Sequence, residues 1–172
     1  GVCLIRLRHM RLKGLPKWFG MNSENAAHRF AVQWLEDGKI REGVYIPDRD
    51  TNSSLNQLVG GRLFPGIHHL ADFEVWESGG RLRVGYDRRQ GGCSVKVVAR
   101  TVPAWPAGSV FETLDGASEF YRHGNVGWSE ADSGCCLEGM QLECSRWELS
   151  PVLVERFESS YLQDPNRLPP GS

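Results

Sequence analysis

The chain has 172 residues, a formal net charge of −1, 40% apolar residues and 24% charged residues. This size and composition are typical of one globular domain with a sizeable core, and they exclude a disordered or collagen-like chain. No apolar run reaches the roughly 18 residues that span a bilayer, and the near-neutral charge argues against a membrane-surface or nucleic-acid binder. Arginine outnumbers lysine by 16 to 4, which limits any mechanism that needs a lysine amine.

The five cysteines do not suggest a disulfide framework. Their number is odd and two of them, Cys135 and Cys136, are adjacent, so a reduced, cytoplasmic chain is the simpler interpretation. A strand-like pattern begins directly at Val2, and the chain stops at Ser172 without a closing element. We therefore expect residues 1–172 to form a single domain that is truncated at both ends.

Apolar residues recur mostly with a period of two, in short runs separated by glycine, proline, asparagine or aspartate. That pattern predicts a mainly β domain. In chain order, strands are predicted over residues 2–8, 26–34, 40–46, 69–76, 81–87, 94–101, 141–149 and 152–159.

Glycine pairs and capping residues define the connections. Gly79-Gly80 and Gly91-Gly92 suit tight turns, so residues 73–101 are predicted to form an antiparallel meander. Two short helices are predicted over residues 55–59 and 116–122, each preceded by polar capping residues and followed by glycine.

Alternation of side chains along a strand predicts which face each titratable residue occupies. His69 falls on an apolar face with Ala71 and Phe73, and His28 lies among apolar residues of its strand, whereas Lys96 falls on a polar face. The predicted fold is an antiparallel, strongly bent sheet or closed barrel with two short helices. Its interior could hold one small ligand.

The most distinctive stretch is a glycine-rich, proline-containing loop over residues 60–69. It delivers Arg62 and the pair His68-His69 to the mouth of the predicted barrel, near Tyr45. A guanidinium offers a bidentate fork for a carboxylate, and an imidazole titrates near neutral pH. The alternative is a glycine-rich bend whose arginine and histidines satisfy local carbonyls.

Four segments together resemble the YqjF-like bacterial domain of unknown function, which is grouped with the acetoacetate decarboxylase-like superfamily. They cover residues 24–32, the stretch from Gly43 to Thr51, the loop from Gly61 to His69, and Ala107-Gly108-Ser109-Val110-Phe111. The resemblance extends over essentially the whole chain. It implies a bent β-sheet closed around a small-molecule cavity, and longer ends than this chain has.

The resemblance also implies where a catalytic lysine would lie. Acetoacetate decarboxylases carry a Gly-Arg-Glu element and then an aromatic-Pro-Lys-Lys element whose lysine forms a Schiff base. Here Gly61-Arg62 matches the first element, but Leu63 replaces the glutamate, and Phe64-Pro65 is followed by Gly66-Ile67-His68-His69. No lysine occurs between Lys39 and Lys96. Imidazole does not form the stable imine of a primary amine, so we expect no Schiff-base decarboxylation.

Other kinds of site are less well supported by the pattern. His68 and His69 would point apart on a strand, Cys135-Cys136 lacks the spacing of a zinc pair, and no Cys-x-x-Cys occurs, so no metal and no cofactor are expected. No nucleophile elbow surrounds a serine. His28 is either a core histidine whose ring nitrogens are hydrogen-bonded or a ligand contact. Glu24 is either a cap at the end of a loop or an active-site acid.

The sequence therefore predicts a cytoplasmic protein that binds a small carbonyl- or carboxylate-bearing metabolite. Arg62 is the expected anion anchor and His69 the acid or base, while His68, Tyr45, Phe64, Glu24 and His28 are the expected ligand-binding residues. If the chain is an enzyme, proton transfer next to a carbonyl, of a lyase or isomerase type, suits these groups. The alternative is a non-catalytic sensing or protein-interaction module that retains only the fold. Nucleic acid and membrane are not expected partners, and a homo-oligomer is left open.

Overall fold

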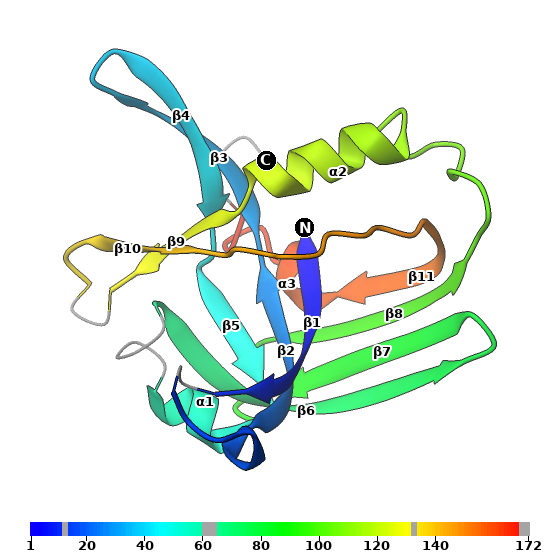
Figure 1. Ribbon diagram of the computed structural model, residues 1–172, viewed down its shortest axis with the longest axis horizontal. Helices are drawn as coiled ribbons and strands as arrows, with labels where there is room; N and C mark the ends of the chain where they lie inside the picture. Colours follow the sequence, from blue (N-terminus) through cyan, green and yellow to red (C-terminus); the bar gives the residue numbers. More distant parts are fainter. Residues whose placement is uncertain (12–13, 60–64, 132–133, 169–172) are drawn as a thin grey trace. The chain divides into compact units, whose positions relative to one another are not determined.

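The computed structural model describes residues 1–11, 14–59, 65–131 and 134–168 (Figure 1). The chain forms two compact units. Unit 1 contains residues 1–70 and 122–143, and unit 2 contains residues 71–121 and 144–172. Both are built mainly of strands, as the period-two pattern predicts. Whether they act as one domain, as expected from the sequence, stays a prediction.

Unit 1 holds two sets of hydrogen-bonded strands. The first has the order β1-β2-β5-β6, in which only the beginning of β6 belongs to this unit, and the second has the order β10-β9-β4-β3. Its elements are β1 (Val2–Met10), a 3₁₀ turn (Lys17–Phe19), β2 (Met21–His28), β3 (Phe30–Glu36), β4 (Lys39–Tyr45), β5 (Asp48–Thr51), α1 (Ser54–Val59), β6 (Ile67–Ser78), β9 (Val126–Glu130) and β10 (Leu137–Gln141).

Unit 2 is an antiparallel set in the order β6-β7-β8-β11, seen along the green and orange ribbons in Figure 1. Its elements are the rest of β6, β7 (Arg81–Arg88), β8 (Ser94–Thr101), most of α2 (Leu114–His123), β11 (Val152–Ser159) and α3 (Ser160–Gln163). Tyr86 is buried and stacks on Phe73 with 5.0 Å between ring centroids. Val95 and Ala99 of β8 are buried as well, on the face that alternation predicts.

Several sequence predictions are confirmed in detail. Strands β8 and β11 have the predicted bounds, and β6, β7 and β8 form the predicted antiparallel meander. Gly79, Gly80, Gly91 and Gly92 all have positive φ, between 56° and 84°, which explains why both hairpin turns carry glycine. The hydroxyl of Ser53 accepts a hydrogen bond from the backbone N–H of Asn56, so the predicted cap of α1 is present as well.

The prediction of a purely antiparallel sheet or closed barrel is wrong. In the described residues each strand set remains open, and two strand pairs, β5 with β6 and β4 with β9, are parallel. Parallel neighbours need a crossover of a dozen or more residues. The connection over residues 52–66, which contains α1, supplies that length between β5 and β6.

Two predicted strands are also corrected. The expected strand over residues 26–34 is interrupted at Arg29, because β2 ends at His28 and β3 begins at Phe30 in the other strand set. The expected strand over residues 141–149 is absent: only Gln141 belongs to a strand, and Leu142 is 61% exposed. Its apolar residues therefore have no buried face to occupy.

The buried interior of unit 1 is unusually polar. Thr51, Asn56 and Ser129 are at most 5% exposed, as are His28 and Asp50. The Asn56 amide donates to the Ser23 hydroxyl, which joins α1 to β2. None of the helices in the described part of the chain has the length and apolar character needed to cross a membrane.

Candidate functional site

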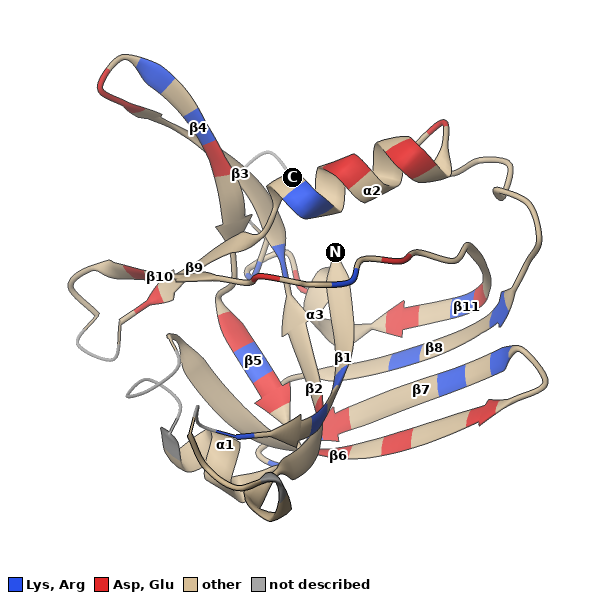
Figure 2. Cartoon of the chain, viewed as in Figure 1, with Lys and Arg blue, Asp and Glu red and all other residues tan. Residues whose placement is uncertain are grey.

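Strands β5 and β6 bring the charged segment Asp48-Arg49-Asp50 beside the histidine pair. Figure 2 shows β5 as a basic band between two acidic bands. The strands pair in parallel with Arg49 opposite His68 and Asp50 opposite His69. Since side chains alternate along each strand, Arg49 and His68 share one face, while His69 shares the other face with both aspartates.

Arg49 is the central cation of this arrangement, and the sequence analysis did not select it. Its Nη1 donates at 2.7 Å to the Pro65 carbonyl and at 2.7 Å to the Ser129 hydroxyl. Its Nη2 is buried and has no hydrogen-bond partner among the described residues. Burial, followed by the nearby Arg29 charge, lowers the Arg49 pKa to about 10, against the opposing influence of Asp48. The guanidinium remains charged at neutral pH and is poorly solvated.

Gly66 allows the chain to pass closely over Arg49. Its φ is +88°, a value that side-chain-bearing residues rarely adopt. A Cβ atom there would lie 2.8 Å from the Cβ and 2.9 Å from the Oγ of Ser129, and closer still to Nη1 of Arg49. Glycine at position 66 is therefore a steric requirement of the contact between Arg49 and Ser129.

The two histidines have different surroundings. His68 is half-buried, and its Nδ1 lies 3.0 Å from the Gly66 carbonyl oxygen, which fixes the ring orientation. Burial lowers the His68 pKa, the hydrogen bond to Gly66 opposes that shift, and the Arg49 charge adds to it. His68 is therefore neutral at pH 7. The Nε2 of His69 lies 3.6 Å from Oδ2 of Asp48, and its side chain is 27% exposed. Both imidazoles are partly exposed, so the two histidines differ in their partners and not in their exposure class.

A second arginine reaches the same region. Arg29 lies close enough to Arg49 to influence its pKa, and the buried Nε of Arg29 has no hydrogen-bond partner among the described residues. Its Nη1 donates to the Cys3 sulfur at 3.3 Å, which is a weak acceptor. Two partly buried guanidinium groups thus lie near one another, each with a nitrogen that no described protein atom satisfies. We call Arg29, Asp48, Arg49, His68 and His69 the basic cluster.

Tyr45, a predicted ligand-binding residue, is linked to this region through β4 and β9. Its hydroxyl donates to Oε1 of Glu130 at 3.2 Å. Burial, then the Glu130 and Asp48 carboxylates, raise the Tyr45 pKa, so the phenol keeps its proton at physiological pH. The adjacent β9 residue is Ser129, the partner of Arg49. Strand β9 therefore supports both Tyr45 and Arg49.

Glu24 has its own surroundings on β2. It forms an ion pair with Arg6, its N–H donates to the Asn52 side chain, and it lines a hollow of about 270 Å³. That hollow is lined by Arg6, Leu7, Arg8, Asn22, Ser23, Glu24 and Asn52. His28 is completely buried, which agrees with its predicted place among core residues. The predicted roles of both residues in ligand binding stay predictions.

Arg62 and Phe64, the predicted anion anchor and one predicted ligand contact, lie outside the described residues. Their roles stay predictions. The described residues on either side of them are α1 and the segment that begins at Pro65. Pro65, the first described residue after them, contacts Arg49 through its carbonyl oxygen.

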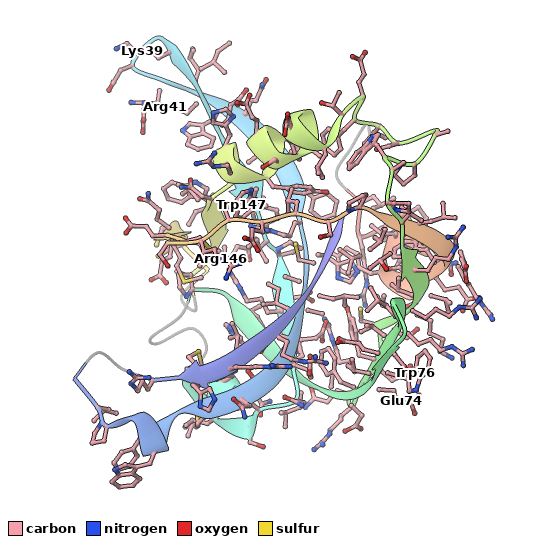
Figure 3. The ribbon with its side chains drawn as sticks, turned by 45° about the vertical axis from the view of Figure 1, so that its right-hand side comes forward. Lys39, Arg41, Glu74, Trp76, Arg146 and Trp147 are labelled. Atoms are coloured by element: carbon pink, nitrogen blue, oxygen red, sulfur yellow. The ribbon has the colours of Figure 1, made fainter. Side chains whose placement is uncertain are left out.

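The lysines nearest to this loop in sequence lie in exposed positions. Lys39, labelled in Figure 3, begins β4 at the end of the β3–β4 hairpin, and its side chain is exposed. Lys96 is exposed on β8 of unit 2, on the polar face that alternation predicts. An amine needs a desolvated or cationic environment to become a nucleophile at neutral pH, and an exposed lysine lacks the desolvation.

Comparisons with protein-family models, with curated proteins and with solved structures find no match for this chain.

Proposed function

We propose that the basic cluster binds a small metabolite that carries a carboxylate next to a carbonyl group. The observation that supports this most strongly is the guanidinium of Arg49, which is charged, largely buried, and leaves Nη2 without a partner among the described residues. Burying a charge without full compensation costs several kcal/mol in order of magnitude. A bound carboxylate would supply the missing acceptors, and a planar guanidinium suits it geometrically.

Each residue of the basic cluster has a definite role in this proposal. Arg49 anchors the carboxylate, with Arg29 adding positive potential and Arg62 forming a second anion contact from the adjoining loop. His69, paired with Asp48 at 3.6 Å on the opposite face of β5 and β6 from Arg49, is the residue expected from the sequence to transfer a proton at the atom next to the carbonyl. Neutral His68 keeps its proton on Nδ1, which donates to the Gly66 carbonyl, so its Nε2 accepts a hydrogen bond from a hydroxyl of the ligand. No covalent lysine intermediate is involved.

Assignment to the acetoacetate decarboxylase-like superfamily belongs to the same proposal. It rests on the sequence resemblance, in which the His68-His69 pair stands where that superfamily carries its lysines, whereas the described strand sets are open and partly parallel. The chemistry would then differ from that of the decarboxylases. Imidazole can transfer protons but cannot form their imine, so enolisation or hydration suits the cluster better.

A sensing module without catalysis is the second candidate. The observation that favours it is the degree to which the cluster is already occupied by protein contacts: Arg49 is held by Pro65 and Ser129, and His68 by Gly66. Rigid groups suit recognition as well as catalysis. Turnover of a bound ketoacid would decide against this candidate.

The proposal is tested by titrating the protein with a panel of 2- and 3-ketoacids, including pyruvate and acetoacetate, and following histidine resonances by NMR. The Arg49→Gln variant should bind the ketoacid that the wild type prefers at least roughly tenfold more weakly, since a hydrogen bond to a charged group is worth about 1.5–3 kcal/mol. Arg89→Gln is the matched control, because Arg89 is exposed on unit 2 and pairs with Asp72.

A second variant keeps the test independent of folding. His69→Gln removes an accessible imidazole and should abolish turnover while circular dichroism remains unchanged. Borohydride treatment with the same ketoacids should leave the intact mass of the protein unchanged. Equal ketoacid binding by the wild type and Arg49→Gln would refute the role of Arg49 as the carboxylate anchor. A mass increase after borohydride treatment, which reports a lysine adduct with the ketoacid, would refute the non-covalent chemistry.

A further inference from the structure

The hairpin that joins β9 to β10 carries two adjacent cysteines that the proposed function does not use. Glu130 of β9 pairs with Leu137 of β10, and the connecting loop between them ends with Cys135 and Cys136. Two backbone hydrogen bonds fold the loop: the N–H of Ala131 donates to the Cys136 carbonyl at 2.9 Å, and that of Gly134 donates to the Ala131 carbonyl at 2.8 Å. Gly134 has a φ of +67°, as a tight turn requires.

This loop conformation brings the two sulfur atoms together. In an extended strand, adjacent side chains point to opposite faces, so neighbouring cysteines would diverge. Here both residues lie in a bend before β10, and their sulfurs are 3.8 Å apart. Both residues are exposed to solvent. The hairpin therefore presents an accessible dithiol on its outer surface.

The separation of the sulfurs suits chelation. A tetrahedral ion with metal–sulfur bonds of about 2.3 Å holds two sulfur ligands about 3.8 Å apart. Thiolates are soft ligands and select soft ions. From this geometry, we propose that Cys135 and Cys136 together form a binding site for a soft, thiophilic metal or metalloid ion.

The size of the ligand set narrows the class of ion. In the described part of the chain, no third His, Cys, Asp or Glu ligand atom lies within 4.8 Å of both sulfurs. A structural zinc ion takes four protein ligands, which the described part of this loop does not supply. Ions that accept two or three ligands, such as Cu(I) or a trivalent arsenical, fit the dithiol better.

Phenylarsine oxide is a suitable probe because its reaction with a dithiol is balanced and needs no oxidant. Two arsenic–sulfur bonds form, the two thiol protons and the arsenical oxygen leave as one water molecule, and arsenic remains trivalent. The 172-residue chain is incubated with one equivalent of the probe in excess mercaptoethanol, and the intact mass is measured. The wild type should gain one phenylarsenic group, which a small dithiol then removes.

Single-cysteine variants separate chelation from ordinary thiol binding. Cys135→Ser and Cys136→Ser should each weaken binding roughly 100-fold or more, because the second bond forms intramolecularly at high effective concentration. Cys144→Ser is the matched control: Cys144 is also exposed but has no neighbouring cysteine in sequence, so its loss should leave binding unchanged. Equal binding by the wild type and Cys135→Ser, or loss of binding in Cys144→Ser, would overturn the proposal.

Discussion

Replacing Gly66 with alanine adds one methyl group at the closest backbone approach of the basic cluster. The substitution has two separable costs. The left-handed backbone itself, with φ at +88°, costs a residue with a side chain about 1–2 kcal/mol. The new Cβ also lies 2.8 Å from Ser129 Cβ and closer to Nη1 of Arg49, so both side chains must move away from residue 66. We expect this movement to break a hydrogen bond between them or to Pro65.

The second cost is estimated from the hydrogen bonds that this movement breaks. Arg49 donates to both Pro65 and Ser129 at 2.7 Å, and a hydrogen bond to a charged group contributes about 1.5–3 kcal/mol. Loss of one such bond together with the backbone strain predicts a decrease of about 3 kcal/mol in the free energy of unfolding. Urea denaturation followed by circular dichroism measures this decrease directly.

Gly38→Ala provides the matched control in the same unit. Gly38 has a φ of +74°, but a Cβ there meets nothing within 4 Å, so this variant reports the strain alone, about 1–2 kcal/mol. The Gly66→Ala variant should therefore lose about 2 kcal/mol more than Gly38→Ala and should also bind ketoacids more weakly. Equal decreases in the free energy of unfolding in the two variants would show that close contact of residue 66 with Arg49 and Ser129 does not contribute to the cost.

Two further predictions concern pH and a single hydrogen bond. The His68 pKa is lowered in the folded state, so the unfolded chain binds more protons, and the free energy of unfolding falls as the pH drops below 6.5 toward the folded-state pKa. In His68→Asn, the decrease in the urea midpoint between pH 7 and pH 5 should therefore be smaller than in the wild type. An equal decrease in the two proteins would contradict a lowered His68 pKa. Tyr45→Phe removes the hydrogen bond to Glu130 and should lower the free energy of unfolding by about 0.5–1 kcal/mol in the same denaturation assay. A stability gain in that variant would refute the contribution of this contact.

The sequence predicts correctly the strands that are determined by local residue patterns, and it misses the strands that depend on pairing with distant segments. Strands β8 and β11 alternate apolar and polar residues and are bounded by turn residues, so their ends are predicted correctly. Strand β5 was not predicted, because Asp48-Arg49-Asp50-Thr51 has no apolar alternation. Its place between β2 and β6, which buries Asp50 and Thr51, depends on pairing between segments far apart in the chain.

The break at Arg29 has a similar explanation. Residues 26–34 alternate well enough for one strand, yet the two halves pair with different neighbours, which no local pattern reports. The same limit applies to the candidate site. The histidine pair was predicted from its loop, whereas Arg49 acquires its importance from Ser129, 80 residues away along the chain. The charged triplet after Pro47 gives no local signal of this role, because short charged segments are ordinarily solvated.

The fit of Gly66 over Arg49 and Ser129 also makes these three positions depend on one another. The contact links an arginine, a glycine and a serine that are far apart in the chain. Pro65, which directly precedes the glycine, follows Arg49 by 16 positions, and Ser129 follows Arg49 by 80 positions. Each member of this discontinuous set restricts the other two. A substitution at any one of these three positions is therefore expected to disturb the contact made by the other two.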